Sequence, residues 1–263
     1  MSKMRKALLV VLTLALIKLP LDKLLAAVLP DVSVDAAPQL LATAAVTLLL
    51  MGVPALLLRP WTSPRLVRTE KRWTYLLLAV ITAVLTRAAL TPVDAAWQNA
   101  LGLAAQTMPL PESAGETALY IVALALIPAV AEELFYRGSL LTGLLDGSRR
   151  ATAVLLTTAM FALMHGSLAN LPGLLVISLL LTLLMLHSGS VAVPLAAHFF
   201  YNICALIWGS VPLWGSILSG AGLIALTGCI ILRQPKLVHP PMKRADGLIA
   251  AAALAVLAAQ YFV

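Results

Sequence analysis

The stretch that decides the fold covers residues 151–232 and reads ATAVLLTTAMFALMHGSLANLPGLLVISLLLTLLMLHSGSVAVPLAAHFFYNICALIWGSVPLWGSILSGAGLIALTGCIIL. It contains no Asp, Glu, Lys or Arg. A helix that crosses the hydrocarbon core of a bilayer needs about 20 mostly apolar residues. The stretch is several times that length, so it predicts consecutive spanning helices joined by short turns. A soluble surface of this composition is excluded because it would carry no charge.

The rest of the chain has the same character. Of its 263 residues, 61% are hydrophobic and only 11% are charged, and the mean hydropathy is +0.98. A soluble domain carries about 25% charged residues. We therefore expect an all-α, polytopic transmembrane helix bundle with about eight to nine spans.

Hydrophobic segments and the turns between them predict nine helices, of which the first is interrupted by charges. They cover residues 7–29, 39–58, 73–90, 117–142, 151–165, 171–187, 191–208, 213–232 and 247–262. We divide the chain into N-terminal membrane helices with an outer loop, a central bundle, and a basic loop with a final membrane helix. These parts cover residues 1–116, 117–232 and 233–263.

The basic residues indicate how the chain is oriented. Lys and Arg cluster at the N-terminus and in segments 59–72, 143–150 and 233–246, whereas segment 91–116 has none. Short basic loops favour the cytoplasm, and nine spans place all of these basic segments on one side. We therefore expect a cytoplasmic N-terminus in a bacterial inner membrane. The net charge of +7 is then explained by topology and lipid headgroups rather than by nucleic acid.

A few polar residues interrupt this apolar sequence. An ionised side chain at the bilayer centre costs about 2.5–3.5 kcal/mol on insertion scales, so it needs a partner. These residues lie in AVAEELFYRGSL, FALMHG and AAHFFYN: Glu132, Glu133, Arg137, His165, His198 and Asn202.

Helical spacing separates the two glutamates. Successive residues of a helix turn by about 100°, so Glu133 and Arg137 share a face and can pair. Glu132 points in another direction and can face a cavity. The Glu133–Arg137 pair is therefore expected to be structural, and Phe161 lies on the same face as His165.

The polar residues of the three helices gain most in lipid by meeting one another. We expect Glu132, His165, His198 and Asn202 to line one cavity, with Glu132 and His165 in direct hydrogen-bond contact or separated by one water. Taken alone, each of His198 and Asn202 is better explained as an interhelical hydrogen-bonding group.

Three motifs occur in order, each in its own hydrophobic segment. EELFYR fits E-E-x-x-x-R, FALMH fits F-x-x-x-H, and HFFYN fits H-x-x-x-N. Together they resemble the CPBP intramembrane proteases, a family that includes the CAAX prenyl endopeptidases. The resemblance covers about residues 117–232, and the flanking segments carry no recognised motif.

The resemblance implies an intramembrane endopeptidase of the glutamic type. Glu132 matches the catalytic glutamate, with His165 helping it to activate water. His198 and Asn202 match the pair that stabilises the oxyanion. The implied substrate is a membrane-associated peptide or protein, prenylated or not. The sequence leaves the oligomeric state open.

We expect no cofactor. The H-E-x-x-H zinc motif is absent, as are G-x-S-x-G and G-x-G-D. A zinc ion held by Glu132, His165 and His198 is the alternative, because these are zinc ligand types.

Two other functions fit buried polar groups. One is a transporter or proton relay, since intramembrane Glu, His and Arg mark such pathways. No inverted repeat or pair of broken helices supports it. The other is a non-proteolytic scaffold or immunity protein that keeps the fold and binds a partner.

Overall fold

The computed structural model describes residues 1–28, 36–62, 72–103, 111–207, 211–233 and 241–261, and every regular element among them is helical. The elements are α1 (Lys3–Val28), α2 (Ala36–Thr47), η1 (Leu48–Gly52), α3 (Val53–Thr62), α4 (Arg72–Leu101), α5 (Ala114–Tyr120), η2 (Ile121–Leu126), α6 (Ile127–Glu133), η3 (Leu134–Leu141), α7 (Thr142–Leu145), α8 (Arg150–Met164), α9 (Leu171–Ser188), α10 (Ala192–Ile207), α11 (Leu213–Leu232) and α12 (Arg244–Ala259). The elements labelled η are π-helical turns inside longer helices.

In the described part of the chain these elements form nine continuous helical stretches, which correspond to the nine predicted helices. The largest difference is the helix predicted over 73–90, which runs on to Leu101 as α4. Its extension is held by tertiary contacts that no local pattern reveals. Trp97 Nε1 donates to the carbonyl of Leu168 at 2.9 Å, and Gln98 Nε2 donates to that of Ala169 at 3.2 Å.

Fewer of the described helices are long enough to span a membrane than the nine helical stretches would suggest. Five described helical stretches are long and apolar enough to cross a membrane: Leu40–Leu58, Trp73–Leu101, Ala114–Leu145, Leu171–Ser188 and Leu213–Leu232. Two further apolar helices, Arg150–Met164 and Ala192–Ile207, are shorter. The chain is thus an all-helical integral membrane protein, and the predicted eight to nine spans are not confirmed.

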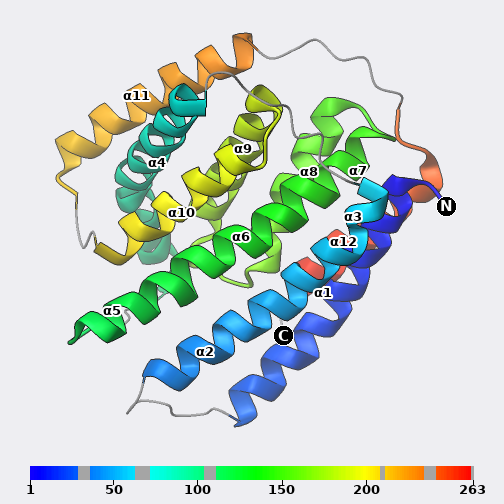
Figure 1. Cartoon of the computed structure of the whole chain (residues 1–263), viewed down its shortest axis with the longest axis horizontal. Helices are drawn as coiled ribbons and strands as arrows, with labels where there is room; N and C mark the ends of the chain where they lie inside the picture. Colours follow the sequence, from blue (N-terminus) through cyan, green and yellow to red (C-terminus); the bar gives the residue numbers. More distant parts are fainter. Residues whose placement is uncertain (29–35, 63–71, 104–110, 208–210, 234–240, 262–263) are drawn as a thin grey trace.

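The central stretch from α5 to α7 lies within the bundle, with other helices packed on its sides (Figure 1). α1 and α12 pack together on one side of it, while α4, α10 and α11 pack together on another. η3 supplies several fully buried side chains to the largest apolar cluster: Phe135, Tyr136, Leu140 and Leu141. The first polar motif therefore lies on a stretch of helix whose side chains are mostly buried.

Three segments predicted to share one membrane side meet at one end of the bundle. Near the N-terminus, Lys3 forms an ion pair with Asp146 at 3.3 Å. Arg5 Nε donates to Asp246 Oδ1 at 2.7 Å, at the start of α12. Most of the fourth basic segment, 59–72, lies outside the described residues. The structure therefore groups the described basic segments, while the side of the membrane they face stays a prediction.

A contact between α4 and α9 fixes the depth of α9. The backbone N–H of Gly173, in the first turn of α9, donates to Asp94 Oδ1 at 3.0 Å. A β carbon at position 173 would lie 2.6 Å from Asp94 Oδ2, so only glycine allows this approach. The acidic residue also satisfies a backbone donor at a helix N-terminus, where negative charge is favourable.

Candidate active site

Glu133 and Arg137 form the predicted pair. Arg137 Nη1 donates to Glu133 Oε1 at 2.7 Å, and both side chains are fully buried. Arg137 Nη2 also donates to the carbonyl oxygen and the hydroxyl of Ser178, each at 2.9 Å. The pair therefore joins the α6–η3 junction to α9. Ser178 was not among the predicted residues, although a serine inside the apolar run LLVISLLL is a signal of an interhelical contact.

His198 is bound to this same pair. Its Nδ1 lies 2.9 Å from Glu133 Oε1, and its side chain is 5% exposed. A carboxylate oxygen only accepts hydrogen bonds, so Nδ1 carries the proton. In the neutral ring, Nε2 is then an acceptor. The resemblance placed His198 with Asn202 alone, whereas the structure ties it to the structural glutamate as well.

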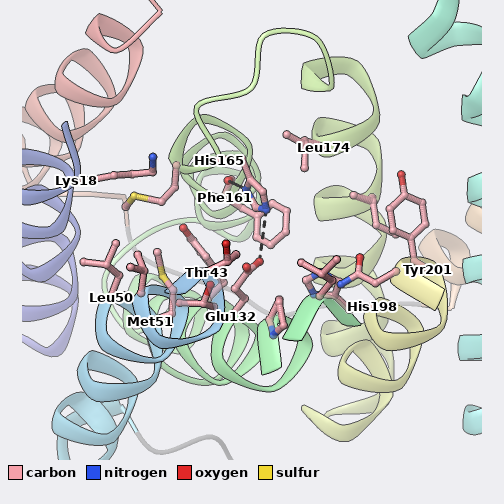
Figure 2. A pocket seen from close by; sticks show the side chains of 18 of the residues that line it. Lys18, Thr43, Leu50, Met51, Glu132, Phe161, His165, Leu174, His198 and Tyr201 are labelled. Atoms are coloured by element: carbon pink, nitrogen blue, oxygen red, sulfur yellow. Dashed lines mark hydrogen bonds and ion pairs between the residues drawn. The ribbon is translucent and has the colours of Figure 1, made fainter. Parts of the chain in front are cut away.

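Glu132 and His165 point toward one another from α6 and from the end of α8 (Figure 2). Glu132 Oε2 and His165 Nε2 are 3.6 Å apart, which is longer than a direct hydrogen bond. His165 Nδ1 donates to the carbonyl of Phe161 at 2.8 Å, so in the neutral ring Nε2 is the acceptor that faces Glu132. The distance of 3.6 Å between Glu132 and His165 fits the predicted arrangement with one intervening water better than the predicted direct hydrogen bond.

Phe161 lies between the motif residues. Its ring centroid is 4.6 Å from that of His165, 5.8 Å from that of His198 and 5.0 Å from that of Tyr136. The guanidinium carbon of Arg137 lies 4.6 Å from the same centroid, in cation–π contact. The phenylalanine of the second motif thus sets the spacing between residues of all three motifs.

The four predicted catalytic residues line one cavity of about 620 Å³ (Figure 2). Glu132, His165, His198 and Asn202 contribute polar atoms from α6, α8 and α10. The facing wall comes from α2 and η1, which lie outside the motif-bearing segment, and its residues recur at helical spacing: Ala42, Thr43, Val46, Thr47, Leu50 and Met51. This wall was not predicted, although Thr43 and Thr47, one helical turn apart in an otherwise mostly apolar helix, are a signal of a face that borders a cavity.

The last residues of the described chain reach the loop that carries His165. Gln260 Nε2 donates to the carbonyl of Leu163, and the hydroxyl of Tyr261 lies 3.5 Å from the same oxygen. Next to His165, Gly166 has a φ of +66°, a conformation that glycine adopts without strain. The end of the chain therefore supports the turn in which His165 sits.

The described residues contain no cluster of three or more His, Cys, Asp or Glu side chains arranged to hold a metal ion. Within the described part of the chain, Glu132, His165 and His198 therefore do not form a three-ligand cluster for zinc.

Comparison with known proteins agrees with the motifs. A family model described as Type II CAAX prenyl endopeptidase Rce1-like matches residues 114–204. This segment runs from the start of α5 into α10 and contains all seven motif residues. Neither the curated proteins nor the solved structures include a match to the chain. Residues 114–204 are therefore similar to the type II CAAX prenyl endopeptidases, the group that the three motifs of the sequence resemble.

Proposed function

We propose that this protein hydrolyses a peptide bond of a membrane-associated protein or peptide, using a water activated by Glu132 and His165. One observation carries the proposal. A glutamate and a histidine from separate helices face each other across 3.6 Å at the wall of a cavity. A water about 2.8 Å from each atom fits this spacing. Catalytic hydrogen bonds are often long before substrate binds.

The two acceptors suit the two hydrogens of one water. Glu132 Oε2 accepts one hydrogen and His165 Nε2 accepts the other, which leaves an oxygen lone pair free to attack a carbonyl carbon. Glu132 takes the proton as the carbon–oxygen bond forms. It then returns this proton to the leaving nitrogen as the carbon–nitrogen bond breaks, so the products are a carboxylic acid and an amine. No metal is needed for these steps, and we propose a metal-free site.

Asn202 and His198 would serve the developing oxyanion. The Asn202 side-chain amide can donate directly, whereas His198 donates from Nε2 only when both ring nitrogens carry protons. Preorganised donors of this kind stabilise the tetrahedral intermediate because they are in place before charge develops. Glu133 would keep His198 oriented through Nδ1.

The wall formed by α2 and η1 would bind the apolar part of the substrate. Its stripe of Ala, Val, Leu, Met and Thr side chains faces the polar groups, so one end of a substrate can be apolar while its peptide bond lies beside Glu132. An isoprenyl chain on a C-terminal Cys-aliphatic-aliphatic-X sequence has this character. An unmodified hydrophobic peptide has it too.

The decisive experiment compares the wild type with Glu132→Gln in proteoliposomes. The probes are an internally quenched peptide that ends in S-farnesyl-Cys-aliphatic-aliphatic-X, and the same peptide without the farnesyl group. Glu116→Gln is the matched control, because Glu116 is an exposed glutamate at the start of α5. We expect the wild type and Glu116→Gln to release the same fragment, identified by mass spectrometry, and Glu132→Gln to release none.

Normal cleavage by Glu132→Gln would reject the glutamate mechanism. If the wild type cleaves neither probe, new protein termini in membranes of expressing cells, with Glu132→Gln as the comparison, provide the wider test. No Glu132-dependent terminus would favour the scaffold function, and solute flux through proteoliposomes would favour the transporter.

A further inference from the structure

Tyr136 is fully buried beside the candidate catalytic glutamate, and its hydroxyl has no hydrogen-bond partner among the described residues. Glu132 Oε2, one helical turn earlier, also has none. Both residues line the cavity, whereas Glu133 and Arg137 are not among its lining residues. Two unpartnered polar atoms thus lie on the same stretch of the cavity wall. The family resemblance assigned a role to only one of them.

Packing does not account for this hydroxyl. The Tyr136 ring contacts Phe135 and Phe161 edge to face, with both pairs of centroids 5.0 Å apart, and the Arg137 guanidinium lies 5.9 Å from its centroid. A phenylalanine ring would make the same three contacts. A buried hydroxyl without a partner is unfavourable, and most such groups in native proteins have one. Tyr136 lines the cavity, so a substrate group bound there is a candidate partner for this hydroxyl.

The two histidines and the glutamate of the site are acceptors, and Tyr136 is a potential donor one helical turn from Glu132. His165 and His198 both use Nδ1–H on protein acceptors, so their Nε2 atoms accept when the rings are neutral. Glu132 accepts as well. Asn202 donates irrespective of protonation, and four further lining residues carry donor groups: Lys18, Thr43, Thr47 and Tyr201. The negative oxygens of a tetrahedral intermediate need donors.

We propose that Tyr136 is a further catalytic residue, whose hydroxyl donates a hydrogen bond to the reacting oxygen beside Glu132. This inference rests on the proposed peptidase function. The hydroxyl keeps its proton throughout: Glu132 carries the proton from water to the leaving nitrogen, and Tyr136 stabilises the charge on the oxygen while the carbon–nitrogen bond breaks.

The test is Tyr136→Phe, which removes the hydroxyl and keeps the ring. Tyr75→Phe is the matched control. Tyr75 lies on α4, packs against His187 of α9 and does not line the cavity. Each variant is assayed with the quenched peptides in proteoliposomes and melted in detergent. We expect Tyr136→Phe to lower kcat by about 10²-fold, the scale of losing one oxyanion donor. KM should change little, and the melting temperature should stay equal or rise.

A kcat within about threefold of the wild type would overturn the inference while leaving the Glu132 mechanism intact. A lower melting temperature would overturn it as well, because the hydroxyl would then have a structural partner. As a second variant, a fluorinated tyrosine at position 136 keeps the hydroxyl and makes it a stronger donor. We expect it to retain activity where Phe does not, and loss of activity in both variants would contradict the role. If the wild type cleaves nothing, the catalytic role of Tyr136 falls with the proposed function.

Discussion

His198 Nδ1 lies 2.9 Å from Glu133 Oε1, so the histidine of the third motif is bound to the second glutamate of the first. The same oxygen accepts from Arg137 at 2.7 Å. One carboxylate oxygen therefore joins the α6–η3 stretch to α10. The glutamate that holds the site together and the glutamate proposed to act in it are neighbours in sequence, facing different surroundings.

The first prediction concerns Glu133→Gln. This change leaves the fully buried guanidinium of Arg137 without its carboxylate, and breaking a buried ion pair in this way costs about 3–5 kcal/mol. We expect lower abundance in membranes and a lower melting temperature in detergent. Glu132→Gln should keep near-normal abundance, because Glu132 lacks such a partner. Equal abundance of the two variants would contradict the structural role of Glu133.

The second prediction concerns Gln260, which supports the turn at His165 from the far end of the chain. Gln260→Ala removes the donor to the Leu163 carbonyl and frees the end of α8. We expect kcat to fall by about tenfold with little change in KM, since small displacements of catalytic groups cost activity. Leu248→Ala, an exposed position on the same helix, is the control and should remain fully active. A rise in KM alone would point to a substrate-binding role instead.

The third prediction concerns orientation. In a Cys229→Ser background, which leaves the buried Cys204, single cysteines replace the exposed residues Glu112 and Arg149. An impermeant maleimide added outside intact cells should label position 112 and reach position 149 only after lysis. This follows from the grouping of the basic segments at one end of the bundle and from their preference for the cytoplasm. The reverse pattern would invert the proposed topology.

The fourth prediction concerns metal. If Glu132 and His165 activate water without a metal ion, the reconstituted protein should retain its peptidase activity after exhaustive treatment with EDTA and phenanthroline. The structural reason for this expectation is that the described residues hold no group of three or more His, Cys, Asp or Glu side chains arranged to bind a metal ion. Loss of activity that added zinc restores would instead make the protein a metallopeptidase, with zinc as the group that activates water.

Much of the molecule could be predicted from local sequence. In lipid each helix must satisfy its own backbone hydrogen bonds, so long apolar segments become helices, and the hydrophobic pattern predicts the nine helical stretches of the described residues. Spacing within one helix separates Glu132 from Glu133 and pairs Glu133 with Arg137, because those positions are joined by a single helical turn. The convergence of Glu132 and His165 also follows, since buried polar groups must find one another.

Tertiary structure alone decided which partner each polar group found. The sequence by itself determined the helices, the Glu133–Arg137 pair and the candidate residues. It did not determine that Ser178 accepts a hydrogen bond from Arg137, that Gln260 supports the turn at His165, or that α2 and η1 form the apolar wall of the cavity. The physical reason is that helices apolar on every face carry no periodic signal of which side meets lipid, protein or cavity. Those contacts are set by packing between helices far apart in the chain.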